Sequence, residues 1–97
     1  MKKKIYVFLE FQDFNEPFVK VFTSLDDALL YKIREERKLK ERTESETISV
    51  DGKKRKVYDD CHVYDLLNGC RAQLVRYHYN KGREVINIEI REQEIEI

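Results

Sequence analysis

The four cysteine and histidine residues of this chain all fall within residues 61–78. They are Cys61, His62, Cys70 and His78. Thiolate and imidazole groups both suit a tetrahedral Zn²⁺ ion, so these residues form a candidate zinc set. No two of them have the close spacing of a zinc knuckle, and adjacent residues of an extended chain point to opposite faces. We therefore predict no metal and no cofactor, and expect two buried cysteines and two ordinary histidines.

Nucleophilic catalysis would need one of these thiols beside an imidazole, with a carboxylate to orient the ring. The acids nearby in the sequence are Asp59, Asp60 and Asp65. No glycine-rich phosphate or oxyanion loop accompanies them, because a turn or a cap accounts for each of the three glycines. We predict that the protein is not an enzyme.

A run of four basic residues is the clearest signal for nucleic acid. It consists of Lys53, Lys54, Arg55 and Lys56. On a hairpin it would lie along phosphates, with Tyr58, Tyr77 and Tyr79 as faces on which bases stack. The alternative is a hairpin whose lysines only discourage edge-to-edge aggregation. Interleaved glutamates in residues 34–46 and an acidic C-terminal stretch weigh against nucleic acid.

Length and composition limit the elements that carry these residues. The 97 residues predict a single domain, residues 1–97, and the 41% hydrophobic fraction suffices for a small core. Nineteen basic residues balance nineteen acidic ones, which argues against a whole surface that grips nucleic acid. No apolar run approaches the roughly 20 residues of a membrane span. Only two cysteines occur, so we expect reduced thiols and a cytoplasmic location, and the alternative is one disulfide between Cys61 and Cys70.

The N-terminal third predicts a hairpin followed by a helix. Residues 5–11 alternate apolar side chains on both faces, which is typical of a central strand, and residues 18–23 form its antiparallel partner after a turn at residues 13–17. Ser24 caps a helix with an apolar stripe up to Ile33. Beyond Ile33 the chain is almost wholly charged, and the sequence leaves open whether the helix continues past Leu39.

The remainder predicts a second hairpin and two more strands. Asp51-Gly52 is typical of a type I′ turn, which would place Ile48 opposite Arg55 in a protruding arm of residues 47–58. Residues 65–69 read as the end of a short helix capped by Gly69. Strands follow at 72–79 and 84–90. The apolar phase then slips towards Ile95 and Ile97, so either a bulge near Glu92 or a separate segment is expected.

The predicted fold is α+β: a four-stranded, mainly antiparallel sheet, one main helix on one face, and an inserted basic hairpin. Eleven per cent of the residues are aromatic, and the strands are apolar on both faces. This exceeds what one helix covers, so the second face would meet a partner, including a second copy of the chain, through that face or an edge. The alternative is that residues 59–69 fold over it.

Residues 5–35 carry a resemblance to a known group. A hairpin ends in Val21-Phe22-Thr23-Ser24 and leads into a helix that begins Leu-Asp-Asp-Ala. This resembles small uncharacterised ββα proteins of bacteria and their phages, in which a VFSS-x-E-x-A phrase joins strand to helix. The resemblance covers about a third of the chain. It implies no catalytic residues, and it suggests a phage or mobile-element accessory protein that blocks a host or defence component.

Two functional hypotheses follow. The first is a non-enzymatic protein-binding module that inhibits a larger host or defence protein by occupying its functional surface. The second is an RNA- or DNA-binding accessory protein that uses residues 53–56. Arginine and tyrosine dominate interface hot spots. The candidate contact residues are Arg37, Lys40, Lys53, Lys54, Arg55, Lys56, Tyr58 and Tyr64.

Overall fold

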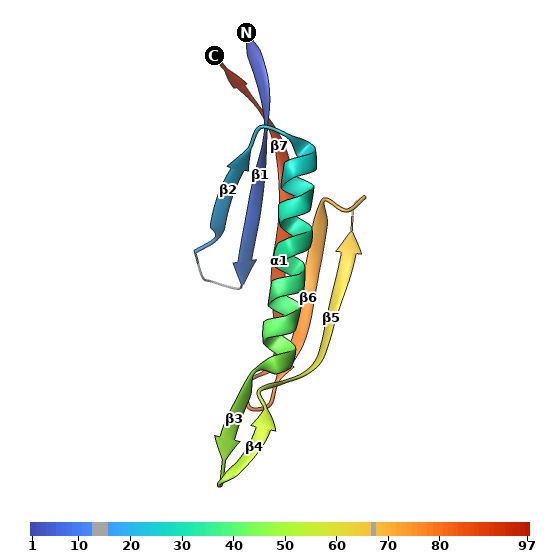
Figure 1. Ribbon diagram of the computed structural model, residues 1–97. Coiled ribbons are helices and arrows are strands. Elements are labelled where there is room, and N and C mark those ends of the chain that lie inside the picture. Colours follow the sequence, from blue (N-terminus) through green and yellow to red (C-terminus); the bar gives the residue numbers. More distant parts are fainter. Residues whose placement is uncertain (13–15, 67) are drawn as a thin grey trace.

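The structure is a computed structural model that describes residues 1–12, 16–66 and 68–97 (Figure 1). The predicted turn at 13–17 therefore lies largely outside the described residues. The elements in chain order are β1 (Lys2–Gln12), β2 (Phe18–Phe22), α1 (Leu25–Ser45), β3 (Thr47–Val50), β4 (Lys53–Lys56), β5 (Tyr58–Leu66), β6 (Arg71–His78) and β7 (Gly82–Glu96). They form an α+β fold with one helix packed on one face of an antiparallel sheet.

The main sheet has five strands in the order β2-β1-β7-β6-β5, and β3 and β4 form a separate two-stranded sheet. Every neighbouring pair is antiparallel. The predicted count of four strands was wrong, because residues 58–66 form an edge strand. The sequence did not predict this strand because a β-bulge between Asp59 and His62 interrupts its pairing and its alternation. Asp60 has a φ of 50° in this bulge.

The predicted short helix at residues 65–69 was also wrong. Asp65 and Leu66 end β5 and pair with Ala72 and Arg71, and Leu67 lies outside the described residues. Asn68 and Gly69 both have positive φ, at 52° and 81°. The Asn-Gly pair that resembled a helix C-cap therefore belongs to the hairpin turn between β5 and β6.

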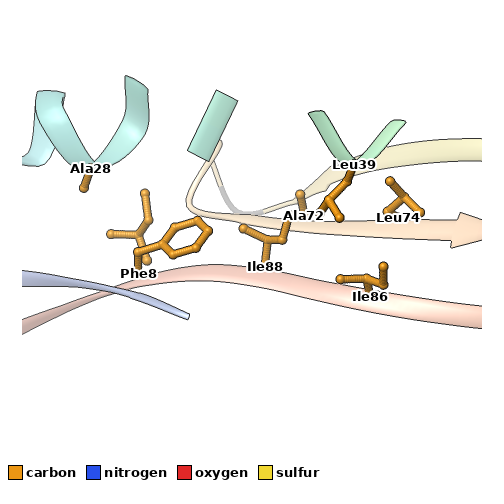
Figure 2. Close-up of a cluster of buried hydrophobic side chains, with 8 residues drawn as sticks. Phe8, Ala28, Leu39, Ala72, Leu74, Ile86 and Ile88 are labelled. Carbon is orange, nitrogen blue, oxygen red and sulfur yellow. The ribbon is translucent and has the colours of Figure 1, made fainter. Parts of the chain in front are cut away.

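Helix α1 runs without interruption to Ser45, so the helix does continue past Leu39. The Ser24 side chain accepts a hydrogen bond from the backbone N–H of Asp27, as its capping role predicted. Ala28 and Leu39 pack onto the sheet against Phe8, Ile86 and Ile88 (Figure 2). Ala72, Leu74 and Ile90 complete this core. The buried Lys32 contacts the carboxylates of Glu36 and Asp65, which ties the helix to β5.

Strand β7 continues in one register from Gly82 to Glu96, and its last residues pair with the start of β1. Lys2 lies opposite Glu96, with no register shift between them. The slip in apolar phase is therefore not a bulge or a separate segment. Ile86, Ile88 and Ile90 face the helix, whereas Ile95 lies on the opposite side of the strand because alternate residues change sides.

The second face of the sheet has no layer over it among the described residues, because residues 58–66 form an edge strand of the sheet instead. We call it the open face. The long molecule carries a ribbon at each end (Figure 1). At one end the two chain termini lie together. At the other end the β3–β4 hairpin projects beyond the helix.

Candidate functional site

The projecting hairpin, residues 47–56, is called the basic arm. Asp51 and Gly52 have φ angles of 52° and 76°, as a type I′ turn requires, so the predicted turn is confirmed. The predicted register is confirmed as well, because Ile48 lies opposite Arg55 and Val50 opposite Lys53. Seven of the eight strand residues are exposed and only Val50 is half-buried, so the hairpin lies outside the body of the protein.

Three of the four cations on β4 form no ion pair with a described residue. Arg55 lies 3.7 Å from the carboxylate of Asp59. Lys53, Lys54 and Lys56 form no ion pair with any described residue, since their cross-strand neighbours are uncharged. Those neighbours are Val50, Ser49 and Thr47. Three lysines therefore present free ammonium groups on one short ribbon.

A network of hydrogen bonds and stacked side chains attaches the arm to the body. The backbone N–H of Val57 donates to the carbonyl of Glu46 at 3.1 Å, and that of Tyr79 donates to the carbonyl of Val57 at 2.9 Å. The Arg55 guanidinium lies 4.6 Å from the centre of the Tyr79 ring. The Tyr79 ring stacks on His78 at 4.8 Å. These contacts hold the base of the arm in a defined direction.

The same stacking continues into the body. The His78 ring meets Tyr58 edge to face at 5.3 Å, and the Arg76 guanidinium lies 4.0 Å from the Tyr58 ring centre. Arg76 also donates to the Thr43 hydroxyl at 3.1 Å and lies 3.8 Å from Glu84. Burial raises the pKa of the Tyr58 hydroxyl against the lowering effect of Arg76. Tyr58, a predicted contact residue, is thus half-buried. It belongs to the chain of stacked side chains from Arg55 to Arg76 that attaches the arm to the body, which we call the joint.

A cavity of about 460 Å³ lies beside the joint, under the C-terminal half of α1. Its lining is mixed, with Glu10, Arg42 and Arg76 beside apolar side chains. Burial, and then the nearby Glu35, raise the pKa of Glu10 above its usual range, while Arg42 lowers it. One oxygen of Glu10 is buried with no hydrogen-bond partner among the described groups. The lining contains no cysteine, histidine or serine that would act as a nucleophile.

The structure does not bring the candidate zinc set together. Cys61 packs against the core, whereas His62 belongs to the next position of β5 and points to the open face. The carbonyl of Cys70 accepts from the N–H of Ile90, and the ring of His78 accepts from the N–H groups of Asn80 and Lys81. Both cysteines are free. Within residues 1–12, 16–66 and 68–97 no group of three metal-ligating side chains converges.

The Cys61 thiol is also unsuited to nucleophilic attack. Burial raises its pKa above the ordinary value, and Glu44 raises it further, while Lys40 and Arg76 act in the opposite direction. The thiolate is the reactive form of cysteine, so a raised pKa lowers its reactivity at neutral pH.

The eight predicted contact residues lie on three different surfaces. Residues 53–56 form the arm, and Tyr58 lies at its base. Arg37 and Lys40 lie on the flank of α1, where they line a depression with Cys61 and His62 of β5. Tyr64 lies on the open face and is 52% exposed. No single partner surface includes all eight.

Two cations beside the arm went unnoticed in the sequence. Lys81 and Arg83 lie in and just after the β6–β7 turn, next to Tyr79 at the base of the arm. Both are exposed, and neither forms an ion pair with a described residue. Residues 53–56 and 81–83 are far apart in sequence, so only the strand order reveals that they share one end of the molecule.

No helix in the described part of the chain has both the length and the apolar character needed to cross a bilayer. Comparisons with protein-family models, curated proteins and solved structures found no match to this chain. Its function must therefore be inferred from its own surfaces.

Proposed function

We propose that the protein is a non-enzymatic nucleic-acid-binding accessory protein whose basic arm contacts the phosphate backbone. The observation that carries this proposal is the set of three lysines on the arm, Lys53, Lys54 and Lys56, none of which forms an ion pair with a described residue. Free ammonium groups on an exposed ribbon displace the cations that condense on nucleic acid, and this release favours binding.

The zero net charge of the chain does not oppose this proposal, because the charges are unevenly distributed. Elsewhere in the described chain many cations have carboxylate partners, as Lys2, Lys4 and Lys40 do. Five cations that form no ion pair with a described residue lie at the arm and the adjacent β6–β7 turn, and others, such as Lys3 and Arg34, lie elsewhere. A polyanion approaching this end meets a local field that the whole-chain total conceals.

The test is a salt-dependent binding assay with a labelled oligonucleotide and the variant Lys53→Gln/Lys54→Gln/Lys56→Gln. We expect the wild-type Kd to rise steeply with salt and the variant to bind about a hundredfold more weakly, with a smaller salt dependence. The matched control is Lys2→Gln/Lys3→Gln/Lys4→Gln at the opposite end, which should change the Kd by less than about threefold. Equal losses in the two variants, or no salt dependence in the wild type, would contradict the proposal.

A second candidate is the protein-binding module, an inhibitor that occupies a surface of a larger host or defence protein in the cytoplasm. The observation that favours it is an apolar patch on the edge strand β2 and the open face. Val19 and Val21 are 51% and 55% exposed there. An edge strand without charged side chains on that face accepts another strand, from a partner protein or from a second copy of this chain.

The two candidates separate in one pull-down from bacterial lysate, run with and without nuclease. A catch that disappears with nuclease supports the nucleic-acid proposal. A stoichiometric protein that survives nuclease, and is lost in Val19→Ser/Val21→Ser but not in the arm variant, supports the inhibitor.

A further inference from the structure

We infer that the bound nucleic acid is single-stranded and that its bases stack on a row of aromatic side chains on the open face. This inference rests on the proposed function, because it assumes that the arm holds the backbone. The aromatic row consists of Tyr64 and His62 from β5 and Tyr77 from β6. None of the three belongs to the core.

The strand registers place these side chains on one face in three successive rungs. Tyr64 lies opposite Gln73 of β6, which in turn lies opposite Asn87 of β7. The next rung is His62, Val75 and Val85. The third is Asp59, Tyr77 and Arg83. Residues two apart in a strand point the same way, so all three rungs lie on the face opposite α1.

The aromatic rings of the row are accessible. Tyr64 and Tyr77 are 52% and 41% exposed, and the ring centres of His62 and Tyr64 are 6.3 Å apart. Gln73 and Tyr77 are four residues apart on β6, so the row extends over about 13 Å of strand. Every base has an aromatic face, so such a platform binds unpaired bases with little preference for sequence. In a duplex those faces are already stacked on one another.

Polar and positive groups flank the row in the way a single strand requires. The Gln73 side-chain amide donates to Oδ1 of Asn87 at 3.0 Å, which leaves the Gln73 side-chain oxygen and the Asn87 side-chain amino group for base edges. Glu89 is held by both Arg71 and Arg91, so this trio keeps one positive charge. Asp59 is paired with Arg55. Arg83 therefore lies opposite Tyr77 as a cation that forms no ion pair with a described residue.

The row also leads towards the basic arm. Tyr77 is the rung nearest the β6–β7 turn, and this turn adjoins the base of the arm through Tyr79 and Val57. A strand lying along the row therefore reaches Arg83 and Lys81 and then the lysines of β4. The aromatic row and the cations form one continuous surface, which favours a single strand over a duplex. A duplex would contact the arm alone, with the β3–β4 ribbon lying in one of its grooves.

The test compares the binding of a fluorescein-labelled oligodeoxythymidylate of about 15 nucleotides with that of a duplex of equal length. We expect the single strand to bind at least tenfold more tightly and to quench the tyrosine fluorescence of a protein that has no tryptophan. Tyr64→Leu/Tyr77→Leu should weaken single-strand binding by about thirtyfold and leave duplex binding unchanged. Tyr64→Phe/Tyr77→Phe keeps the rings and should bind like the wild type.

The outcomes distinguish this inference from the proposal on which it rests. Loss of binding in the arm variant, together with unchanged binding in the leucine variant or a preference for duplex, overturns the aromatic row and leaves the arm's function standing. Absence of binding to either probe at low salt overturns both. Circular dichroism and thermal unfolding of the leucine variant, compared with the phenylalanine variant, separate lost stacking from lost folding.

Discussion

The two ends of the molecule carry the same structural element, but the lysines are paired with carboxylates at one end and unpaired at the other. Each is a two-stranded antiparallel ribbon rich in lysine. In the terminal ribbon, residues 1–5 and 92–97, Lys2 lies 3.9 Å from Glu94 and Lys4 lies 3.7 Å from Glu92. In the basic arm the lysines face threonine, serine and valine. The charge of a ribbon therefore depends on what the facing strand carries, and counts of lysine alone do not reveal it.

The two ribbons also differ in how they join the body. The terminal ribbon continues β1 and β7 without a break in register. The arm depends on two backbone hydrogen bonds at Val57 and on the stacked side chains from Arg55 to Arg76. One end is an extension of the sheet, and the other is a separate hairpin held by side chains.

The largest expected effect comes from breaking this joint. Arg76→Met removes the cationic partner of the half-buried Glu84 carboxylate and the cation over Tyr58, so we expect the free energy of unfolding to fall by about 2–3 kcal/mol. Hydrogen exchange at the Val57 and Tyr79 amides should accelerate more than exchange at Ile95 in the terminal ribbon. Arg71→Met, an exposed arginine of the same strand, is the control, with a loss below about 0.5 kcal/mol. Equal acceleration at both ends would refute the side-chain joint.

The next effect comes from giving the arm the charge pattern of the terminal ribbon. Thr47→Glu/Ser49→Glu places carboxylates opposite Lys56 and Lys54, and we expect oligonucleotide binding to weaken about tenfold with little change in stability. Thr47→Gln/Ser49→Gln has nearly the same shape without the charge and should bind like the wild type. If both variants bind equally, the free charge of the arm is not what binds.

The reverse exchange should have a smaller effect. Glu92→Gln/Glu94→Gln frees Lys2 and Lys4, and we expect about a twofold to threefold gain in non-specific oligonucleotide binding at low salt. Stability should change by less than about 1 kcal/mol, because these ion pairs are exposed. Fluorescence anisotropy at two salt concentrations measures the gain. A loss of binding would show that the terminal ribbon serves another purpose.

The smallest effect concerns Glu10, a half-buried carboxylate between the two ends. Its pKa in the folded protein is raised from the ordinary value of 4.5, so the folded state binds the proton more tightly than the unfolded state does. Stability is therefore lost as the pH rises through the raised value. Glu10→Gln should be more stable than the wild type at neutral pH, and the difference should vanish below about pH 4. Urea unfolding at both pH values tests this, and an unchanged difference would refute it.

Local sequence signals predicted much of the fold. The alternation in residues 5–11, the cap at Ser24 and the Asp51-Gly52 turn each specify an element through chemistry within a few residues, and all three are confirmed. Strand β5 was not predicted because its bulge breaks the alternation of side chains and because the Asn68-Gly69 turn resembles a helix C-cap. The phase change at Ile95 was misread because it reflects the end of the helix layer, which is a tertiary property.

The candidate site also has a part that local sequence predicts and a part that only the sheet brings together. Residues 53–56 are a contiguous run, so the sequence alone identified them. The rungs of the open face come from three strands whose registers are set by the sheet. Spacing along the chain therefore contains no trace of the neighbourhood of Tyr64 and Gln73, or of Tyr77 and Arg83.

The position of β7 in the sheet has a consequence for how the chain folds. β7 is the last of the described strands, yet it lies between β1 and β6 and joins the hairpin β1–β2 to the hairpin β5–β6. During synthesis neither hairpin has this central partner until β7 has left the ribosome. The core residues Ile86, Ile88 and Ile90 arrive at the same moment. Cooperative folding is therefore expected only after β7 has been synthesised, with slow pairing over long sequence separations.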